Sequence, residues 1–176
     1  MTVVLAQINP TVGDILANYK KIVSNINKFY NKVDLIIFPE LVMCGYPPED
    51  LVLKHKFLEE IDDFLEKLRI LVKKRGIAVI MGAPICKNKK IYNSGIFIYQ
   101  GKLKIIHKNK LPNYGVFDEE RVFSKGKKYD VIKYKKYSIG LLICEDMWFN
   151  QLPNYLKKRG ANIFISINAS PYENKK

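Results

Sequence analysis

The chain has 176 residues, of which 48% are hydrophobic and 27% are charged, and its formal net charge is +13. This length predicts one domain that can bury a substantial core. The longest apolar runs are only a few residues, which excludes a transmembrane helix.

The positive charge comes from 26 lysines and only 4 arginines. Direct base readout and bidentate phosphate contacts favour arginine, so we expect a solvated lysine surface and no nucleic-acid partner. The three cysteines are widely spaced, with no CxxC pair and no Cys/His cluster. This pattern predicts neither a disulfide framework nor a zinc site, and a reducing cytoplasm is the expected location.

The first third of the chain predicts a strand, a helix and a buried strand. Residues 3–8 form a short apolar run that ends at Asn9-Pro10, and no basic region precedes it, so we expect a strand and not a signal peptide. Asp14 can cap a helix. Residues 34–38 are a continuous apolar run typical of a buried strand. The apolar residues at helical spacing after Asp14 are Ile15, Tyr19, Ile22, Val23, Ile26 and Phe29.

A loop rich in proline and glycine, residues 39–50, leads to a second long helix that Gly76 ends. Residues 77–82 predict another buried strand, and residues 91–99 and 102–106 predict a hairpin around Gln100-Gly101. The apolar face of the second helix consists of Phe57, Ile61, Phe64, Leu65, Leu68 and Val72.

The last third has a segment without clear periodicity, residues 107–128. Residues 131–134 and 137–143 predict a strand pair, residues 152–159 a helix, and residues 162–167 a final strand. Single helices between strands, together with hairpins, predict an α/β layered domain with a mixed sheet.

Three predicted strands end in loops that contain charged or reactive side chains: "LIIFPELVMCGYPPEDL", "KIIHKNKLPNYGVFDEERVF" and "IGLLICEDMW". Ligands bind at the carboxyl ends of strands in α/β sheets. Cys144 stands directly before Glu145 and Asp146, and carboxylates raise the pKa of a thiol. A nucleophilic Cys144 therefore needs a base and a cation from elsewhere, which Glu40 and a lysine of the second loop can supply.

These motifs resemble the nitrilase, or carbon-nitrogen hydrolase, superfamily: Pro-Glu after an apolar strand, Lys before Leu-Pro, and "ICEDMW". "FPELVMCGYPPEDL" and "LPNYGVFDEERVF" further resemble the amino-terminal glutaminase domain of glutamine-dependent NAD synthetase. The resemblance runs from "VVLAQINPTVGDILAN" to "NASPY". It implies a nitrilase-like α-β-β-α sandwich with mixed sheets, incomplete at the C-terminus, in which residues 1–176 are a partial glutaminase (amidotransferase) domain without its synthetase domain.

The resemblance assigns catalytic roles to four residues. Glu40 is the base, Cys144 is the nucleophile, and Glu119 orients the site. The lysine lies three residues before the Leu of Leu-Pro, which selects Lys108 and not Lys110. Glu40 would take the thiol proton, and Lys108 would stabilise the oxyanion.

The resemblance also assigns three glutamine contacts: Tyr114, Glu145 and Ser170. Glu145 would meet the α-ammonium group of the substrate. No metal or cofactor is expected at this site, whereas ATP and Mg would serve the absent synthetase domain. The implied partners are glutamine, that synthetase domain and further copies of the chain, with no membrane partner.

Three other interpretations stay open. The chain could be another amidase of the superfamily, acting on ω-amides or carbamoyl compounds, or a non-catalytic remnant. A basic nucleic-acid-binding module would require an affinity that falls steeply with salt. Cys144 alone could be a buried core thiol and Lys108 a surface charge, while Cys44 and Cys86 are expected to be structural.

Overall fold

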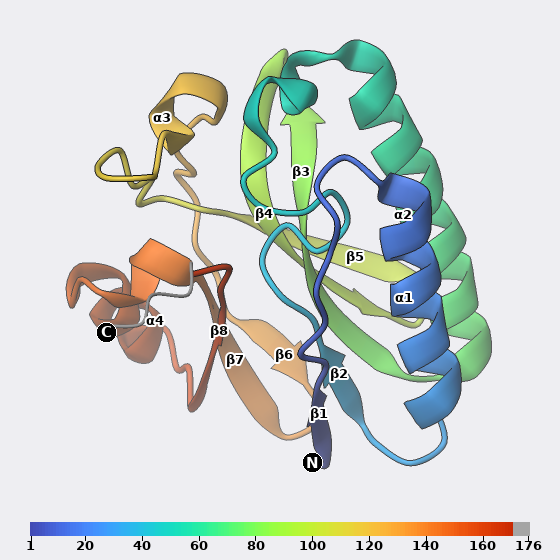
Figure 1. The fold of residues 1–176 in the computed structure, drawn as a ribbon. Helices are drawn as coiled ribbons and strands as arrows, with labels where there is room; N and C mark the ends of the chain where they lie inside the picture. The colour runs from blue at the N-terminus through green and yellow to red at the C-terminus, as the bar shows by residue number, and fades with distance from the viewer. Residues whose placement is uncertain (171–176) are drawn as a thin grey trace, which may run out of the picture.

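Two mixed sheets pack face to face between layers of helices in the computed structural model, which describes residues 1–170 (Figure 1). The strand order is β1-β2-β3-β4-β5 in the first sheet and β6-β7-β8 in the second. The pairs β1–β2, β2–β3 and β7–β8 are parallel, and the others are antiparallel. The strands are β1 Val3–Leu5, β2 Leu35–Ile37, β3 Ala78–Lys87, β4 Lys90–Tyr99, β5 Lys102–His107, β6 Ile132–Tyr134, β7 Tyr137–Ile143 and β8 Ile163–Ile167.

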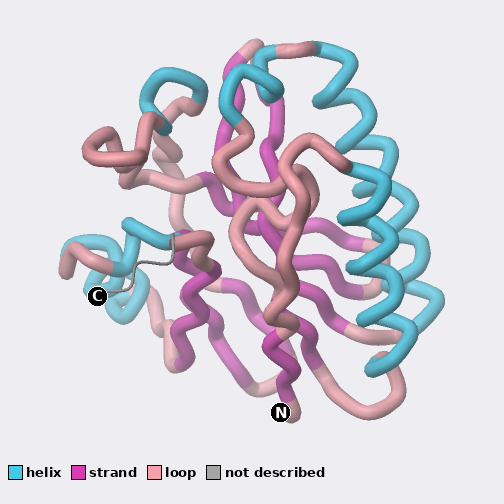
Figure 2. The backbone as a smooth tube through the Cα atoms, viewed as in Figure 1, coloured by secondary structure: helices cyan, strands magenta, loops and turns pink. Residues whose placement is uncertain are grey.

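The helices complete the predicted α-β-β-α order of layers. Figure 2 shows α1 and α2 side by side on one flank of the molecule, with the strands in the middle and α4 on the opposite flank. No helix within residues 1–170 is long and apolar enough to span a membrane. The helices are α1 Ile15–Phe29, α2 His55–Arg75, α3 Glu119–Val122 and α4 Gln151–Lys158, with 3-10 turns η1 Glu49–Leu53 and η2 Cys144–Met147.

The two long helices form where the apolar spacing predicts them. The Asp14 carboxylate accepts a hydrogen bond from the Ala17 N–H at 2.9 Å, which caps α1. Gly76 ends α2 in the left-handed conformation, with φ of 67°. The buried face of α2 packs on the first sheet and consists of Leu58, Ile61, Leu65, Leu68 and Val72.

Successive side chains of a strand point to opposite faces of its sheet, and those on the inner faces form the core between the two sheets. On β7, Ile139, Leu141 and Ile143 face the first sheet, whereas Leu142 faces α4. Gly95 of β4 lies so close to β7 that a Cβ there would come within 2.8 Å of Leu141 Cδ2. The first sheet contributes Leu35, Ala78, Ile80, Phe97 and Ile106 to this core.

The structure departs from the sequence-based expectations at short elements. The strand predicted at residues 77–82 continues to Lys87 and turns into β4 through Asn88 and Lys89, whose φ angles are 50° and 60°. This two-residue turn has no glycine, so it lacks the usual hairpin signal. The first strand is shorter than predicted, ending at Leu5, and the segment without periodicity contains α3.

Candidate active site

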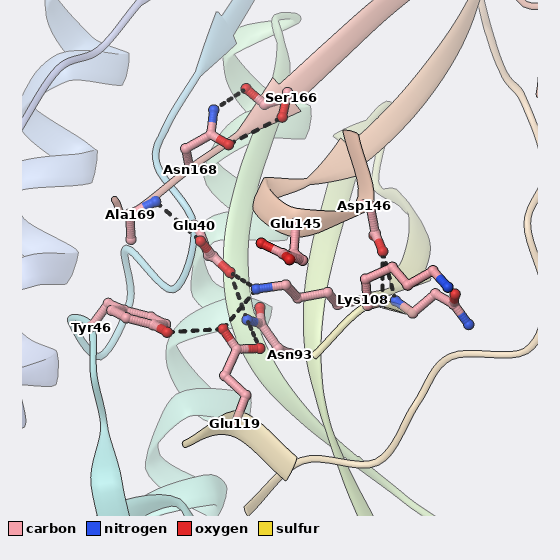
Figure 3. A network of polar contacts seen from close by, with 12 residues as sticks. Glu40, Tyr46, Asn93, Lys108, Glu119, Glu145, Asp146, Ser166, Asn168 and Ala169 are labelled. Atoms are coloured by element: carbon pink, nitrogen blue, oxygen red, sulfur yellow. Dashed lines mark hydrogen bonds and ion pairs between the residues drawn. The ribbon is translucent and has the colours of Figure 1, made fainter. Parts of the chain in front are cut away.

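A buried cluster of charges occupies the end of the first sheet where β2 and β5 finish (Figure 3). Glu40 follows β2, Lys108 follows β5, and Glu119 begins α3. The Lys108 Nζ donates to Glu40 Oε1 at 2.8 Å and to Glu119 Oε1 at 2.6 Å. The exposed fractions are 1% for Glu40, 0% for Lys108 and 3% for Glu119, so water competes little for these contacts.

Close backbone contacts hold Glu40 in this position. The residue lies in a tight turn in which Leu41 has a φ of 47°. A Cβ at Gly82 of β3 would come within 2.2 Å of the Leu41 nitrogen, so only glycine lets β3 pass under this turn. The Ala169 N–H donates to Glu40 Oε2 at 3.0 Å, which ties the turn to the end of β8.

The backbone of Lys108 is held from both sides. Its N–H donates to the Asn93 carbonyl at 2.8 Å, and its carbonyl accepts from the Gly126 N–H at 2.7 Å. Gly126 is again tightly confined, because a Cβ there would lie 2.3 Å from the His107 oxygen. The lysine is therefore aimed into the cluster by main-chain contacts on either side.

The cluster holds one cation between two anions. Burial lowers the pKa of Lys108, but Glu40 and Glu119 outweigh it and raise that pKa above its usual value. Burial raises the pKa of Glu119, with Lys108 opposing this effect. The lysine thus stays charged at neutral pH.

Cys144 lies at the junction of β7 and η2 with a φ of 47°, an uncommon conformation for a residue other than glycine. Its side chain is buried, with 7% exposed. Burial raises the pKa of the thiol to about 11; the Glu40 charge adds to this and the Lys108 charge opposes it. At neutral pH the thiol is therefore protonated, and it needs a base to become a nucleophile.

The structure brings Tyr114 and Glu145 together, and Figure 3 shows Glu145 near Glu40 and Lys108. The Tyr114 hydroxyl lies 3.0 Å and 3.2 Å from the two Glu145 oxygens. Both residues line a pocket of about 280 Å³. Ser170 lies beside the Cys144 thiol, where its side-chain hydrogen bond opposes the rise in the thiol pKa that burial causes, and it lines a larger pocket of about 760 Å³ that Glu40 also lines.

The two lysines of the "HKNK" segment have different environments. Lys108 is buried between carboxylates, whereas Lys110 is partly exposed with its Nζ 5.0 Å from the centre of the Phe149 ring. The lysine that the spacing selects is the one in the cluster. The catalytic and binding roles of the predicted residues remain predictions.

Sequence reasoning missed three residues that shape this site. The Tyr46 hydroxyl donates to Glu119 Oε1 at 3.0 Å. Asn93 of β4 contacts both carboxylates. Asp146 is buried and accepts hydrogen bonds from the Asn109 and Lys110 N–H groups, at 3.0 Å and 2.8 Å.

Asp146, the second acid after Cys144, has a structural role. Its carboxylate fastens η2 to the loop that follows Lys108, so the cysteine and lysine segments are joined by main-chain contacts. Burial raises the pKa of Asp146 to about 6, although these hydrogen bonds lower it. The only signal for such a role was its place beside Cys144.

Comparison with known proteins gives a consistent result. A model of the carbon-nitrogen hydrolase family matches residues 2–176. The glutamine-dependent NAD(+) synthetase of Thermotoga maritima is 38% identical over 176 residues, covering 98% of this chain and 30% of the relative. That of Synechocystis sp. is 38% identical over 194 residues, covering 97% of this chain and 34% of the relative.

Solved structures agree with this fold. The glutamine-dependent NAD+ synthetase of Acinetobacter baumannii, in complex with ADP, has a TM-score of 0.88 and 35% identity, covering 98% of this chain and 33% of that one. A nitrilase-superfamily amidase from Nesterenkonia has a TM-score of 0.87 at 22% identity, a likeness of fold alone. This chain spans about a third of the length of the synthetases it matches.

Proposed function

This chain belongs to the carbon-nitrogen hydrolase family, and on that premise we propose that it hydrolyses the side-chain amide of glutamine through a thioester on Cys144. The observation that carries the proposal is the burial of Lys108 between Glu40 and Glu119, with a protonated thiol within reach of their charges. A base, a cation and a nucleophile are the groups that amide cleavage requires.

The first half of the reaction forms the thioester. Glu40 takes the proton from the Cys144 Sγ, and the thiolate attacks the amide carbon. The Lys108 ammonium and a backbone N–H after Cys144 stabilise the oxyanion, an effect worth about 3 kcal/mol per donor. Glu40 then gives its proton to the amide nitrogen as the C–N bond breaks, and ammonia leaves.

The second half restores the enzyme. Glu40 takes a proton from a water molecule, whose oxygen attacks the thioester carbon. The C–S bond breaks, the Cys144 sulfur recovers a proton from Glu40, and glutamate is released. Glu119 keeps Lys108 in position through the 2.6 Å contact, and Tyr46 in turn holds Glu119. Each proton of this cycle comes from Cys144 or from the water molecule and passes through Glu40, so the protons and bonds of the two halves balance.

The choice of glutamine rests on Tyr114, Glu145 and Ser170. Glu145 is a carboxylate that accepts a hydrogen bond from the Tyr114 hydroxyl and lines a pocket, which suits the α-ammonium group of an amino acid. Ser170 lines the pocket that reaches Glu40. The names of the synthetase relatives include glutamine dependence, which supports this substrate.

The released ammonia would serve ATP-dependent NAD synthesis from deamido-NAD. The relatives that this chain matches over about a third of their length are glutamine-dependent NAD(+) synthetases. ATP and Mg would act in a synthetase domain distinct from residues 1–170, and the cycle described above uses neither.

An amide panel tests the substrate assignment. Ammonia release from glutamine is expected, and Cys144→Ala should abolish it. Glu145→Gln should raise the KM for glutamine about 10-fold, the usual effect of losing one hydrogen bond to a charged group, without changing the KM for α-ketoglutaramate, which lacks the α-ammonium. Faster cleavage of α-ketoglutaramate or of N-carbamoyl amino acids than of glutamine would overturn the proposal in favour of another amidase.

A further inference from the structure

Asn93 is the neutral member of the buried cluster. Its side chain projects from β4 and is fully buried. The Nδ2 atom donates to Glu40 Oε1 at 2.8 Å and reaches Glu119 Oε2 at 3.4 Å (Figure 3). Its Oδ1 is buried without a hydrogen-bond partner within the described residues.

The four carboxylate oxygens of Glu40 and Glu119 accept hydrogen bonds from different donors. Lys108 reaches one oxygen of each carboxylate. Ala169 supplies the second oxygen of Glu40, and Asn93 supplies the second oxygen of Glu119 while sharing the first oxygen of Glu40. The Asn93 amide is thus the neutral side chain in residues 1–170 that joins both carboxylates.

The two carboxylates impose the orientation of the Asn93 amide, which leaves its Oδ1 unpaired. Turning the amide over would place Oδ1 against two carboxylates, which is repulsive. A buried acceptor without a partner is itself unfavourable. The protein therefore gives up one hydrogen bond at Asn93 to keep both N–H groups on Glu40 and Glu119.

We propose that Asn93 is a positioning residue that fixes Glu40 as the base and holds Glu119 in place beside Lys108. Two anions around one cation leave the cluster with a net negative charge, which would favour uptake of a proton by one carboxylate. A second cation would prevent that but would also bind Glu40 tightly. An amide donor opposes proton uptake without adding charge. This inference rests on the proposed role of Glu40.

Two substitutions at Asn93 should each move a different limb of the pH–activity profile. Asn93→Ala removes the donor, so the acidic limb of kcat/KM for glutamine should move to higher pH, with kcat about 10- to 100-fold lower at neutral pH. Asn93→Asp keeps the shape, and its carboxyl can donate only when protonated. Activity of that variant should persist at low pH and fall as the pH rises, so the alkaline limb moves to lower pH.

Asn18→Ala is the matched control. Asn18 is also fully buried, but it lies on α1 and bonds to the backbone of Thr11 and Met43. This variant should lower the melting temperature, as Asn93→Ala does, while leaving both limbs of the pH profile in place. All variants are compared well below their melting temperatures.

Alkylation of Cys144 by iodoacetamide across the same pH range separates this inference from the proposed function. If Asn93→Ala and Asn18→Ala give the wild-type alkylation and activity profiles, Asn93 is merely structural and the inference fails. If the alkylation profile shifts with Asn93→Ala but the wild type releases no ammonia from glutamine, the positioning role stands and the substrate assignment fails.

Discussion

Two charge clusters of similar make-up meet at the short helix α3. In one, Lys108 lies between Glu40 and Glu119, fully inside the protein. In the other, Arg121 contacts Glu49, Asp50 and Asp118 on the surface, with 39% of its side chain exposed. Each has one cation among several acids, yet only the buried one excludes water.

The difference lies in what replaces water around the charges. Surface pairs are screened and contribute little to stability. In the buried cluster, Asn93, Tyr46 and the Ala169 N–H supply the donors that water would otherwise supply. A fixed set of donors holds each charge in one geometry, which a catalytic base and an oxyanion donor require.

Removing the buried cation should give the largest effect. Lys108→Met leaves two carboxylates buried without their counter-ion, so the free energy of unfolding should fall by about 3–5 kcal/mol. The rate of ammonia release should fall at least about 100-fold, because the proposed oxyanion donor is lost. Urea unfolding and a coupled ammonia assay measure these two effects.

Lys104→Met is the matched control for this variant. Lys104 lies on β5, the strand that Lys108 directly follows, and pairs with Asp130 at the surface. Its loss should leave activity within about two-fold, in line with the small contribution of exposed pairs. Equal losses in the two variants would contradict a special role for the buried lysine.

Asp146 is the intermediate case, a buried carboxylate whose partners are backbone N–H groups. Its pKa is raised from 3.8 to about 6, so the folded state binds its proton more tightly than the unfolded state. Ionisation therefore costs stability as the pH rises from about 4 to 6. The unfolding free energy of the wild type minus that of Asp146→Asn should fall by roughly 1–3 kcal/mol over this range. A constant difference would contradict the raised pKa.

Breaking the surface cluster should have the smallest effect. Arg121→Ala removes every ion pair of that cluster, but its charges are already solvated. The melting temperature should change by less than about 3 °C and activity by less than about two-fold. A larger loss of activity would show that the surface cluster holds α3, and hence Glu119, in place.

The elements that sequence predicts well are those with long periodic patterns. The helices α1 and α2 repeat their apolar residues often enough to indicate both type and buried face, and the apolar run of β7 indicates a buried strand. The β3–β4 turn was missed because Asn88 and Lys89 reach positive φ without glycine. The short α3 and η2 span about one turn, too little for a periodic signal.

The sequence predicted only those site residues whose type and position form a recognisable catalytic pattern. Glu40 and Cys144 stand at strand ends in a pattern that suggests nucleophilic catalysis, and resemblance added Lys108 and Glu119. Asn93 could not be found this way, because a polar residue in a strand has the same pattern whether it faces solvent or a buried anion. Asp146 was hidden for a related reason, since its partners are main-chain groups of a loop distant in sequence.

Reaction with an electrophilic glutamine analogue, followed by peptide mass spectrometry, tests the central claim most directly. The buried cluster is expected to activate Cys144, so labelling should occur there and not at Cys44 or Cys86, free glutamine should suppress it, and Glu40→Gln should slow it. Labelling of the exposed Cys86 instead, or labelling of Cys144 that neither glutamine nor Glu40→Gln affects, would contradict the account.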